Sequence, residues 1–347
     1  METMMQIKNQ TGKRRNNGKR MTAVLLSLIL ILGTIQTAFA AEQTEAFRQA
    51  TETLPVAEET VTSNAFAAAT DVIKEMDDSE REQATDESLD EPQQPTVEPT
   101  EYIPVLMYHH FALRDMGQGD GVTTMQAELE EQVRYFKEQG YSIISLEDLN
   151  RILTKKEREK EKDGDIGLDL KVKYLCITMD DGYFSNYDLA YPVFQKYHVP
   201  ASIFAITDSV TNQIGLKKFS WSNAAQMVRN SKVRIYNHTS NHIPVSQTTT
   251  EAFVAAALAG EEALKEYLPV QQDTVKALAY PNGQTTPELQ EALLEEGFSL
   301  MFTVEQSVIT RNTSRGAIPR IMVSSGMTGE DVIHKIEQTA NRVFAAG

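Results

Sequence analysis

The feature that most constrains the fold is a regular alternation of short apolar runs and helical patterns from residue 101 to the C-terminus. The runs have the length and the β-branched and aromatic content of strands, and segments with helical spacing separate them. Strands that alternate with helices pair in parallel, because parallel neighbours need crossover connections. Seven or eight such units in about 250 residues predict a distorted (β/α) barrel. An open doubly wound sheet is the alternative.

The expected elements follow one another closely along residues 101–347. Helix ends are indicated by capping residues, by glycine after the last turn and by proline in the first turn. Strands are expected at residues 103–108, 141–145, 172–178, 201–207, 233–237, 275–280, 298–304 and 317–323; helices are expected between the cap Thr124 and Gly140, from near Leu146, from Tyr187 to Tyr197, after the cap Ser220, after Thr250, from near Pro287 and after Thr328. In a barrel of this kind the chemistry lies at the carboxyl ends of the strands.

Residues 1–40 have the features of a signal peptide. A basic stretch precedes the apolar run AVLLSLILILGTI, and the segment ends in Ala38-Phe39-Ala40, a small-x-small cleavage site. The alternative is an uncleaved anchor helix, but the run is shorter than the ~20 residues that span a bilayer. No cysteine follows the run, which argues against a lipoprotein anchor. We expect an exported protein, secreted or at the cell surface, with membrane contact only through this segment if it is not cleaved.

Residues 41–100 are expected to form a disordered acidic linker, because they are rich in Glu, Asp, Thr, Gln and Pro. Residues 101–347 then form one domain, which we expect to be monomeric. The formal net charge of −16 at pH 7 excludes the basic footprint of a nucleic-acid-binding protein. The only cysteine, Cys176, permits no intrachain disulfide and lies in an apolar run, where a buried, inert thiol is expected.

Two adjacent carboxylates, Asp180 and Asp181, precede Gly182 at the end of the strand expected at 172–178. Both cannot be buried there as charges unless something positive compensates them. A divalent metal could take one carboxylate as a ligand and leave the other free to act on water. The alternative is a turn, because Asp-Gly pairs are ordinary turn chemistry.

Two histidines, His238 and His242, follow the strand expected at 233–237. An i, i+4 spacing places both rings on one face of a helical turn, close enough to bind a single ion. One carboxylate plus two imidazoles, with positions left open for water, is typical of a catalytic zinc site. Structural zinc sites use four protein ligands, often cysteines, and the sequence offers no such set.

A further pair, His109 and His110, ends the first expected strand. Because histidine titrates near neutral pH, one of these two could protonate a leaving group. The same residue type is more often structural, and its place at the carboxyl end of a strand favours the catalytic interpretation. His198 and His334 lie in helical contexts and are interpreted as structural.

Together these motifs resemble those of the polysaccharide deacetylase family, the NodB-like carbohydrate esterases. The resemblance covers about residues 101–345. It is carried by residues 178–183 (TMDDGY), 238–242 (HTSNH), 105–110 (VLMYHH), 279–283 (AYPNG) and 318–321 (IPRI), of which the last three resemble the subgroup of biofilm-polysaccharide deacetylases.

The resemblance implies a role for each residue of the central motifs. Asp181, His238 and His242 would bind a divalent ion, first of all Zn²⁺, with Co²⁺, Ni²⁺ or Mn²⁺ as alternatives. That ion activates water and polarises the acetamide carbonyl. Asp180 would be the general base, and His109 the acid that protonates the departing amine.

The same resemblance assigns the oxyanion donor, the arginine that orients the base and the substrate contacts. The backbone N–H of Asn282 would help to hold the oxyanion. Many members carry an arginine where this chain has Ala279, and that arginine orients the base. We expect Arg320 to replace it, with Arg315 as the second choice. Side chains expected to contact the substrate are Tyr108, Tyr183 and Tyr280.

The implied function is removal of N-acetyl groups from an N-acetylglucosamine-containing polysaccharide, either peptidoglycan or a biofilm glycan. One alternative is an O-acetyl esterase on xylan-like glycans, since the same site could cleave esters. Another is an inactive carbohydrate-binding domain that keeps the fold, because a fold alone does not determine function. Trp221, the only tryptophan, is expected to pack rather than to stack on a sugar.

Overall fold

The computed structural model describes residues 97–114, 121–158, 166–271 and 275–346. The signal peptide expected at 1–40 and nearly all of the linker expected at 41–100 lie outside the described residues. Within the described part, no helix combines the length and the apolar content that crossing a membrane requires.

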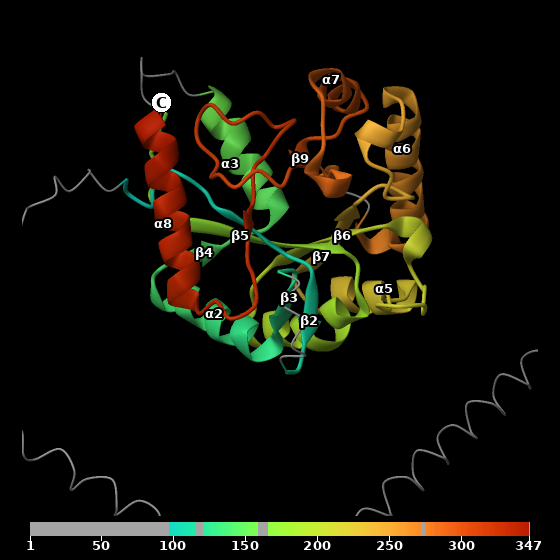
Figure 1. Ribbon diagram of the computed structural model, residues 1–347, viewed down its shortest axis with the longest axis horizontal. Coiled ribbons are helices and arrows are strands. Elements are labelled where there is room, and N and C mark those ends of the chain that lie inside the picture. Colours follow the sequence, from blue (N-terminus) through green and yellow to red (C-terminus); the bar gives the residue numbers. More distant parts are fainter. Residues whose placement is uncertain (1–96, 115–120, 159–165, 272–274, 347) are drawn as a thin grey trace, which may run out of the picture. The chain divides into compact units, whose positions relative to one another are not determined.

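The central feature is one parallel sheet of eight strands that curls into a distorted (β/α) barrel (Figure 1). The order runs from β10 through β1, β5, β6, β7 and β8 to β9, with β4 beside the start of β5. A parallel bridge between Phe302 of β9 and Ile318 joins one edge strand to the segment that leads into β10, the other edge strand, so the two edges of the sheet meet. This confirms the barrel rather than the open sheet. The strands are β1 (Val105–Tyr108), β4 (Ser142–Ile143), β5 (Tyr174–Asp181), β6 (Ala201–Ala205), β7 (Val233–Asn237), β8 (Ala277–Ala279), β9 (Leu300–Phe302) and β10 (Ile321–Met322).

The distortion arises at β4. In a regular barrel this strand would separate β1 from β5, but it pairs only with the first two residues of β5. From Cys176 onward β1 pairs with β5 directly, and Tyr108 lies opposite Met179. The next residues of the two strands, His109 and Asp180, are thereby brought side by side.

β5 is buried on both faces, which explains its uninterrupted apolar sequence. Ile177 and Met179 pack in one cluster with helices that include those at 126–138 and 221–230, whereas Cys176 belongs to a second cluster, formed by side chains from several strands and from the helix at 146–158. Because side chains alternate along a strand, Thr178 and Asp180 share the inner face with Cys176. The expected burial of the thiol is confirmed, and desolvation raises the pKa of Cys176.

Seven helices of the described part pack around the outside of the sheet (Figure 1). Helix α8 lies against α2, so the last helix of the chain packs on the first helix of the domain. The cap expected at Ser220 is confirmed, because its Oγ accepts a hydrogen bond from the Asn223 N–H at 3.1 Å. The helices are α2 (Gln126–Glu138), α3 (Leu146–Arg158), α4 (Tyr191–Tyr197), α5 (Trp221–Asn230), α6 (Thr250–Tyr267), α7 (Pro287–Glu295) and α8 (Gly329–Ala346).

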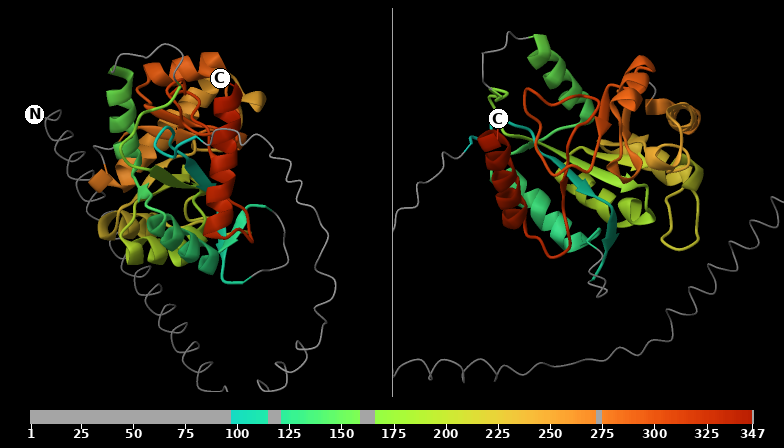
Figure 2. Two further views of the ribbon diagram at one scale, coloured as in Figure 1. Left: turned by 90° about the vertical axis from the view of Figure 1, so that its left-hand side faces the viewer. Right: turned by 45° about the horizontal axis from the view of Figure 1, so that its top comes forward.

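A short two-stranded ribbon precedes α2 and corrects the helix start expected at Thr124. β2 (His110–Ala112) pairs in parallel with β3 (Thr123–Met125), outside the barrel sheet (Figure 2). Thr124 therefore lies in a strand. The helix begins one residue after Met125, whose N–H donates to the Glu128 carboxylate at 2.9 Å.

A π-helical turn, η1 (Asn186–Ala190), precedes α4 where one continuous helix was expected from Tyr187. The Asn186 amide donates to the His109 carbonyl at 2.8 Å, and the Phe111 N–H donates to Ser185 Oγ at 3.0 Å. These bonds tie the wider turn to the chain that leaves β1. Single π turns inside helices are frequent at functional sites.

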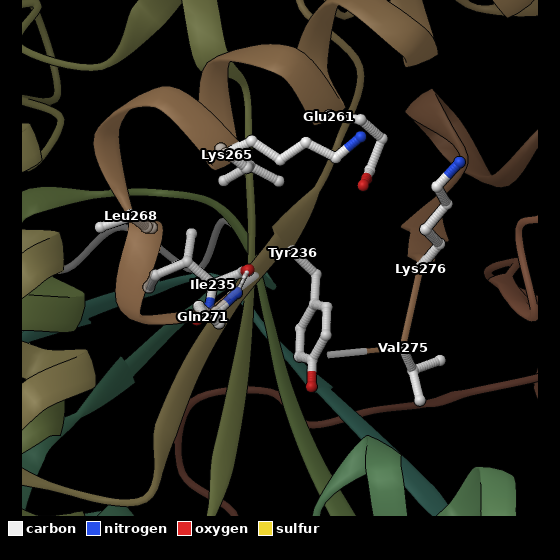
Figure 3. Close-up of a pocket in the computed structure, with 9 residues that line it drawn as sticks. Ile235, Tyr236, Glu261, Lys265, Leu268, Gln271, Val275 and Lys276 are labelled. Atoms are coloured by element: carbon white, nitrogen blue, oxygen red, sulfur yellow. Dashed lines mark hydrogen bonds between the residues drawn. The ribbon is translucent and has the colours of Figure 1, made fainter. Parts of the chain in front are cut away.

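β7 and β8 pair at a single position, Asn237 with Leu278. The Gln271 side chain replaces the missing ladder partner, because its Oε1 accepts from the Ile235 N–H at 2.9 Å and its Nε2 donates to the Ile235 carbonyl. Beside it, between α6 and the two strands, a cavity of about 120 Å³ remains (Figure 3). Residues on its lining include Tyr236, Glu261, Leu264, Lys265 and Lys276.

Candidate metal and catalytic site

The three expected metal ligands converge at the carboxyl ends of β5 and β7. Asp181 Oδ1 lies 3.5 Å from His238 Nε2 and 3.6 Å from His242 Nε2. The three ligand atoms all lie within 4.8 Å of one another. Two atoms bound at ~2.0 Å to one tetrahedral ion lie ~3.4 Å apart, so these separations fit a shared divalent ion.

The histidine loop is irregular, which corrects the helical turn expected from the i, i+4 spacing. Thr239 has a φ of 63° and His242 a φ of 59°, both in the left-handed region. The Thr239 N–H donates to Asn237 Oδ1 at 2.7 Å, and the His242 N–H donates to Thr239 Oγ1 at 3.0 Å. Side-chain acceptors thus take the N–H groups that a helix would have paired, and two left-handed residues bring the rings together.

The protonation states in the site suit metal binding. His238 Nδ1 lies 2.8 Å from the Ala279 carbonyl, which can only accept, so Nδ1 carries a proton and Nε2 is the ring nitrogen that faces Asp181. Burial lowers the pKa of His242, and the neighbouring His238 lowers it further. Burial works against ionisation of Asp181, but hydrogen bonding and charge from His238, together with Lys218, hold its pKa below the usual range. Neutral imidazoles and an ionised carboxylate are the forms that bind metals.

Arg320 reaches Asp180, as expected for the residue that replaces the missing arginine. Its guanidinium donates to both carboxylate oxygens at 2.7 Å and, through Nε, to the Thr303 carbonyl at 2.9 Å. Burial alone would raise the pKa of Asp180, but the Arg320 charge holds it below its ordinary value. The second choice, Arg315, donates instead to two side chains of helix α3, those of Glu157 and Asn150.

His109 lies on the other side of the same carboxylate. Its Nε2 is 4.0 Å from Asp180 Oδ2, and its side chain is 17% exposed. Burial lowers the pKa of His109, although Asp180 and Asp181 raise it. The neighbouring His110 faces elsewhere, because its ring packs edge-on against Tyr183 and its Nδ1 lies 3.5 Å from Thr123 Oγ1.

A tight turn follows β8 beside His238. In this turn, η5 (Pro281–Gly283), Asn282 is exposed and has a φ of 56°. Gly283 has a φ of 67°, and a Cβ there would lie 2.6 Å from the Val304 backbone nitrogen, so only glycine fits. The role of the Asn282 N–H as an oxyanion donor stays a prediction.

The three tyrosines expected at the substrate do not share one environment. Tyr108 and Tyr280 are fully buried, and their hydroxyls donate to Gln132 and to the Gly316 carbonyl. Their assignment as substrate contacts is wrong. Alternation along β1 directs the Tyr108 ring into the core, and the turn after β8 does the same for the Tyr280 ring. Tyr183 alone is partly exposed beside Asp181. The packing role expected for Trp221 is supported by its stacking on Tyr267, with ring centroids 4.6 Å apart.

Sequence reasoning missed two polar residues of the site. Lys218 places its Nζ 3.6 Å from the centre of the Tyr183 ring and interacts electrostatically with Asp181. Asn237 anchors the histidine loop, and its position directly before His238 was the only available signal. Lys218 carried none, because it lies in a loop far from every motif in the sequence.

An open groove adjoins the same end of the barrel. Its volume is about 670 Å³, and its lining comes from the segments that follow His242, Asn282 and β9. Its lining combines hydroxyl and amide side chains with small apolar ones and the Glu305 carboxylate, and Ser246 Oγ donates to Gln284 Oε1 at 2.5 Å. Such a lining offers hydrogen bonds and apolar contact to a sugar ring.

Comparison with known proteins finds similarity to one family and to several of its members. Residues 168–301 match the family model described as polysaccharide deacetylase. The protein YxkH of Bacillus subtilis (strain 168) is 27% identical over 227 residues, which cover 65% of this chain and 73% of YxkH. A poly-β-1,6-N-acetyl-D-glucosamine N-deacetylase of Staphylococcus epidermidis is 28% identical over 156 residues, which cover 43% of this chain and 54% of that protein.

A solved structure supports the fold. The Streptococcus pyogenes deacetylase PplD, in complex with acetate, aligns with a TM-score of 0.58 and 21% identity, over 68% of this chain and 98% of PplD. The matched family segment contains β5, the histidine loop and the turn after β8, so it includes the candidate ligands and the base. Over residues 168–301, the chain is therefore similar to the polysaccharide deacetylases.

Proposed function

We propose that the protein is an exported, metal-dependent N-deacetylase of a polysaccharide that contains N-acetylglucosamine. The observation that carries the proposal is the arrangement around two adjacent carboxylates. Asp181 faces two imidazoles at 3.5 and 3.6 Å, while Asp180 is paired with Arg320 and lies 4.0 Å from His109. A ligand set, a base and a candidate acid thus occupy one end of the barrel.

Asp181, His238 and His242 would hold the ion. Two imidazoles and one carboxylate suit zinc, with Co²⁺, Ni²⁺ and Mn²⁺ as alternatives. When bound there, such an ion supplies a Lewis acid for the acetamide carbonyl and a water that ionises near neutral pH.

The chain's own groups account for the proton transfers. Asp180 is ionised and accepts the proton of the attacking water, while the two hydrogen bonds from Arg320 keep its carboxylate in one orientation. His109, across that carboxylate, donates the proton that the departing amine requires. We assign the backbone N–H of Asn282 to the developing oxyanion.

The substrate class follows from the relatives and from the groove. The Staphylococcus epidermidis relative is named for poly-β-1,6-N-acetyl-D-glucosamine, so this polymer is the first candidate, and peptidoglycan is the second. Tyr183 and the hydroxyl-rich groove offer contacts for a glycan chain. Export through residues 1–40 would bring a monomeric enzyme to such polymers.

The test is acetate release from four substrates: poly-β-1,6-N-acetylglucosamine oligomers, chitooligosaccharides, peptidoglycan and acetylated xylan. The purified protein is assayed as isolated, after chelation and after Zn²⁺ is restored. We expect acetate from an N-acetylglucosamine polymer, loss of activity with the chelator and recovery with zinc. Acetate from xylan alone would make the protein an O-acetyl esterase. Absence of acetate from every polymer in the zinc-loaded protein would refute the enzymatic proposal.

A further inference from the structure

The histidine loop adopts a conformation that requires support. Its residues Thr239 and His242 are both left-handed, which is unfavourable for side chains with a Cβ. The hydrogen bond from the Thr239 N–H to Asn237 Oδ1, 2.7 Å long, is a contact that stabilises the turn. Asn237 and Thr239 are fully buried, so water cannot replace this bond.

The orientation of the Asn237 amide is decided by helix α6. Its Nδ2 donates to the Ala257 carbonyl at 2.7 Å and to Glu261 Oε1 at 3.0 Å. A carbonyl accepts only, and so does an ionised carboxylate, so the NH₂ end of the amide must face them. The oxygen end is thereby directed at the Thr239 N–H. If the amide were reversed, its NH₂ group would face the Thr239 N–H, and its oxygen would face the Ala257 carbonyl and the Glu261 carboxylate.

Helix α6 is shaped to approach this amide closely. Gly260 precedes Glu261, and a Cβ at Gly260 would lie 2.6 Å from Asn237 Oδ1 and 2.9 Å from Nδ2. The Ser240 N–H also donates to a carbonyl of the same helix, that of Ala256, at 3.1 Å. The loop is therefore docked on α6 through backbone and side-chain contacts, of which the Glu261 carboxylate is the only acidic one.

Glu261 is an unfavourable residue for packing alone. It is 9% exposed and lies beside the cavity between α6 and β7 (Figure 3), with the side chains of Lys265 and Lys276 as charged neighbours. An apolar side chain of the same size would fill this position without a desolvation cost. We propose that Glu261 is a positioning residue for the metal site: through Asn237 it holds the His238–His242 loop in the conformation that presents both imidazoles to Asp181. This inference rests on the proposed metal-binding function.

The test compares two substitutions of similar volume in the full chain. Glu261→Gln keeps a carbonyl oxygen that can accept from Asn237, whereas Glu261→Met removes the acceptor. The Zn²⁺ affinity of metal-free protein is measured by competition with a chelator, and the Co²⁺ absorption spectrum reports the ligand geometry. We expect Glu261→Met to bind zinc about 10–100-fold more weakly, the usual cost of losing a group that orients a metal ligand, and to change the spectrum. Glu261→Gln should match the wild type in both.

Two controls separate positioning from general loss of structure. Leu264→Ala, on the same helix and the same cavity, should lower the thermal stability without changing zinc affinity. Glu262→Ala, an exposed neighbour, should change neither. If Glu261→Met does not fold, Gly260→Ala displaces the same amide from another direction and should weaken zinc binding likewise.

The positioning role would be overturned if Glu261→Met bound zinc with wild-type affinity. If Glu261→Met does not fold, wild-type zinc affinity in Gly260→Ala would overturn it instead. A Glu261→Gln protein that binds zinc as weakly as Glu261→Met would also overturn it. Zinc binding is measured without substrate, so the two proposals fail separately. A wild-type protein that binds zinc but releases no acetate would overturn only the enzymatic function.

Discussion

Two regions hold the two neighbouring aspartates of the site, and they do so by different means. Asp180 points into the barrel, where Arg320 from the segment before β10 binds it through a buried, two-point ion pair. Asp181 lies at the rim, opposite imidazoles on a loop that neutral hydrogen bonds and helix α6 support. The proposed base is therefore fixed by a contact inside the barrel, whereas the two histidines of the proposed metal site lie on a loop after β7.

This difference predicts that substitutions in the two regions affect different properties of the protein. A charge that is fully buried depends on its partner, so loss of the interior pair affects folding and catalysis together. The loop is held by hydrogen bonds that are each weaker than the buried ion pair, so loss of one of them should affect metal binding while the barrel stays folded. Substitutions in the two regions test this contrast.

The largest effect is expected at the rim. His238→Ala or His242→Ala should lower metal content and activity together, because three protein ligands leave little redundancy. Orienting groups alone already contribute about 10–100-fold to affinity or activity. Elemental analysis after dialysis and acetate release give the two readouts, and circular dichroism should show an intact barrel. Stoichiometric metal with full turnover in either variant would mean that the ligand set is wrong.

The two aspartates should differ in kind. Asp180→Asn should keep the metal and lose about 10²–10⁴-fold in turnover, as expected for removal of a general base. Asp181→Asn should weaken metal binding instead. The measurement is metal stoichiometry beside kcat for both variants. Equal metal loss in both would show that one carboxylate does not act independently of the other.

The interior pair should contribute to folding in a way that the loop does not. Arg320→Met leaves Asp180 buried without a partner, which should cost about 3–5 kcal/mol of stability. The double variant Arg320→Met/Asp180→Leu should recover most of that stability and none of the activity, because an apolar pair needs no compensation. Urea unfolding of the metal-free proteins measures both. A stable single variant would indicate that the carboxylate takes up a proton or finds another partner.

The acid should matter more for amides than for esters. His109→Ala should reduce amide cleavage much more than cleavage of an activated acetyl ester, with metal content unchanged, because an amine must be protonated to depart. His110→Ala, which alters a residue packed on Tyr183, is the matched control and should be milder on both substrates. A larger loss in the His110 variant would move the acid to that residue.

The smallest effect is expected for the pH dependence of stability that Glu261 contributes. Burial raises the pKa of Glu261 above its ordinary value of 4.5. A raised pKa in the folded state favours folding below that ordinary value, and this contribution is lost as the pH rises through the folded-state pKa. The stability of Glu261→Gln relative to the wild type should therefore increase between about pH 4 and pH 8. Denaturant titrations of metal-free protein test this, with the exposed Glu262→Gln as a control whose difference from the wild type should not change with pH.

The sequence alone determined the architecture and the central residues of the candidate site. The strand and helix patterns were local, and so were the TMDDGY and HTSNH motifs, which placed Asp180, Asp181, His238 and His242 at strand ends. Parallel strands bring their carboxyl ends to one edge, so motifs far apart in the chain could be expected to meet. The choice of Arg320 over Arg315 was also made from sequence, through the neighbouring strand.

Only the tertiary structure decided the features that depend on register and on distant packing. Strand register turned Tyr108 into the core, because one residue along a strand reverses the side. The left-handed Thr239 depends on an amide that α6 orients, and the helical spacing of the histidines gave no sign of it. Lys218 reaches the site through loop contacts with no pattern in the sequence. Local patterns report which segments are strands or helices, whereas these features depend on which side chain of one element faces which group of another.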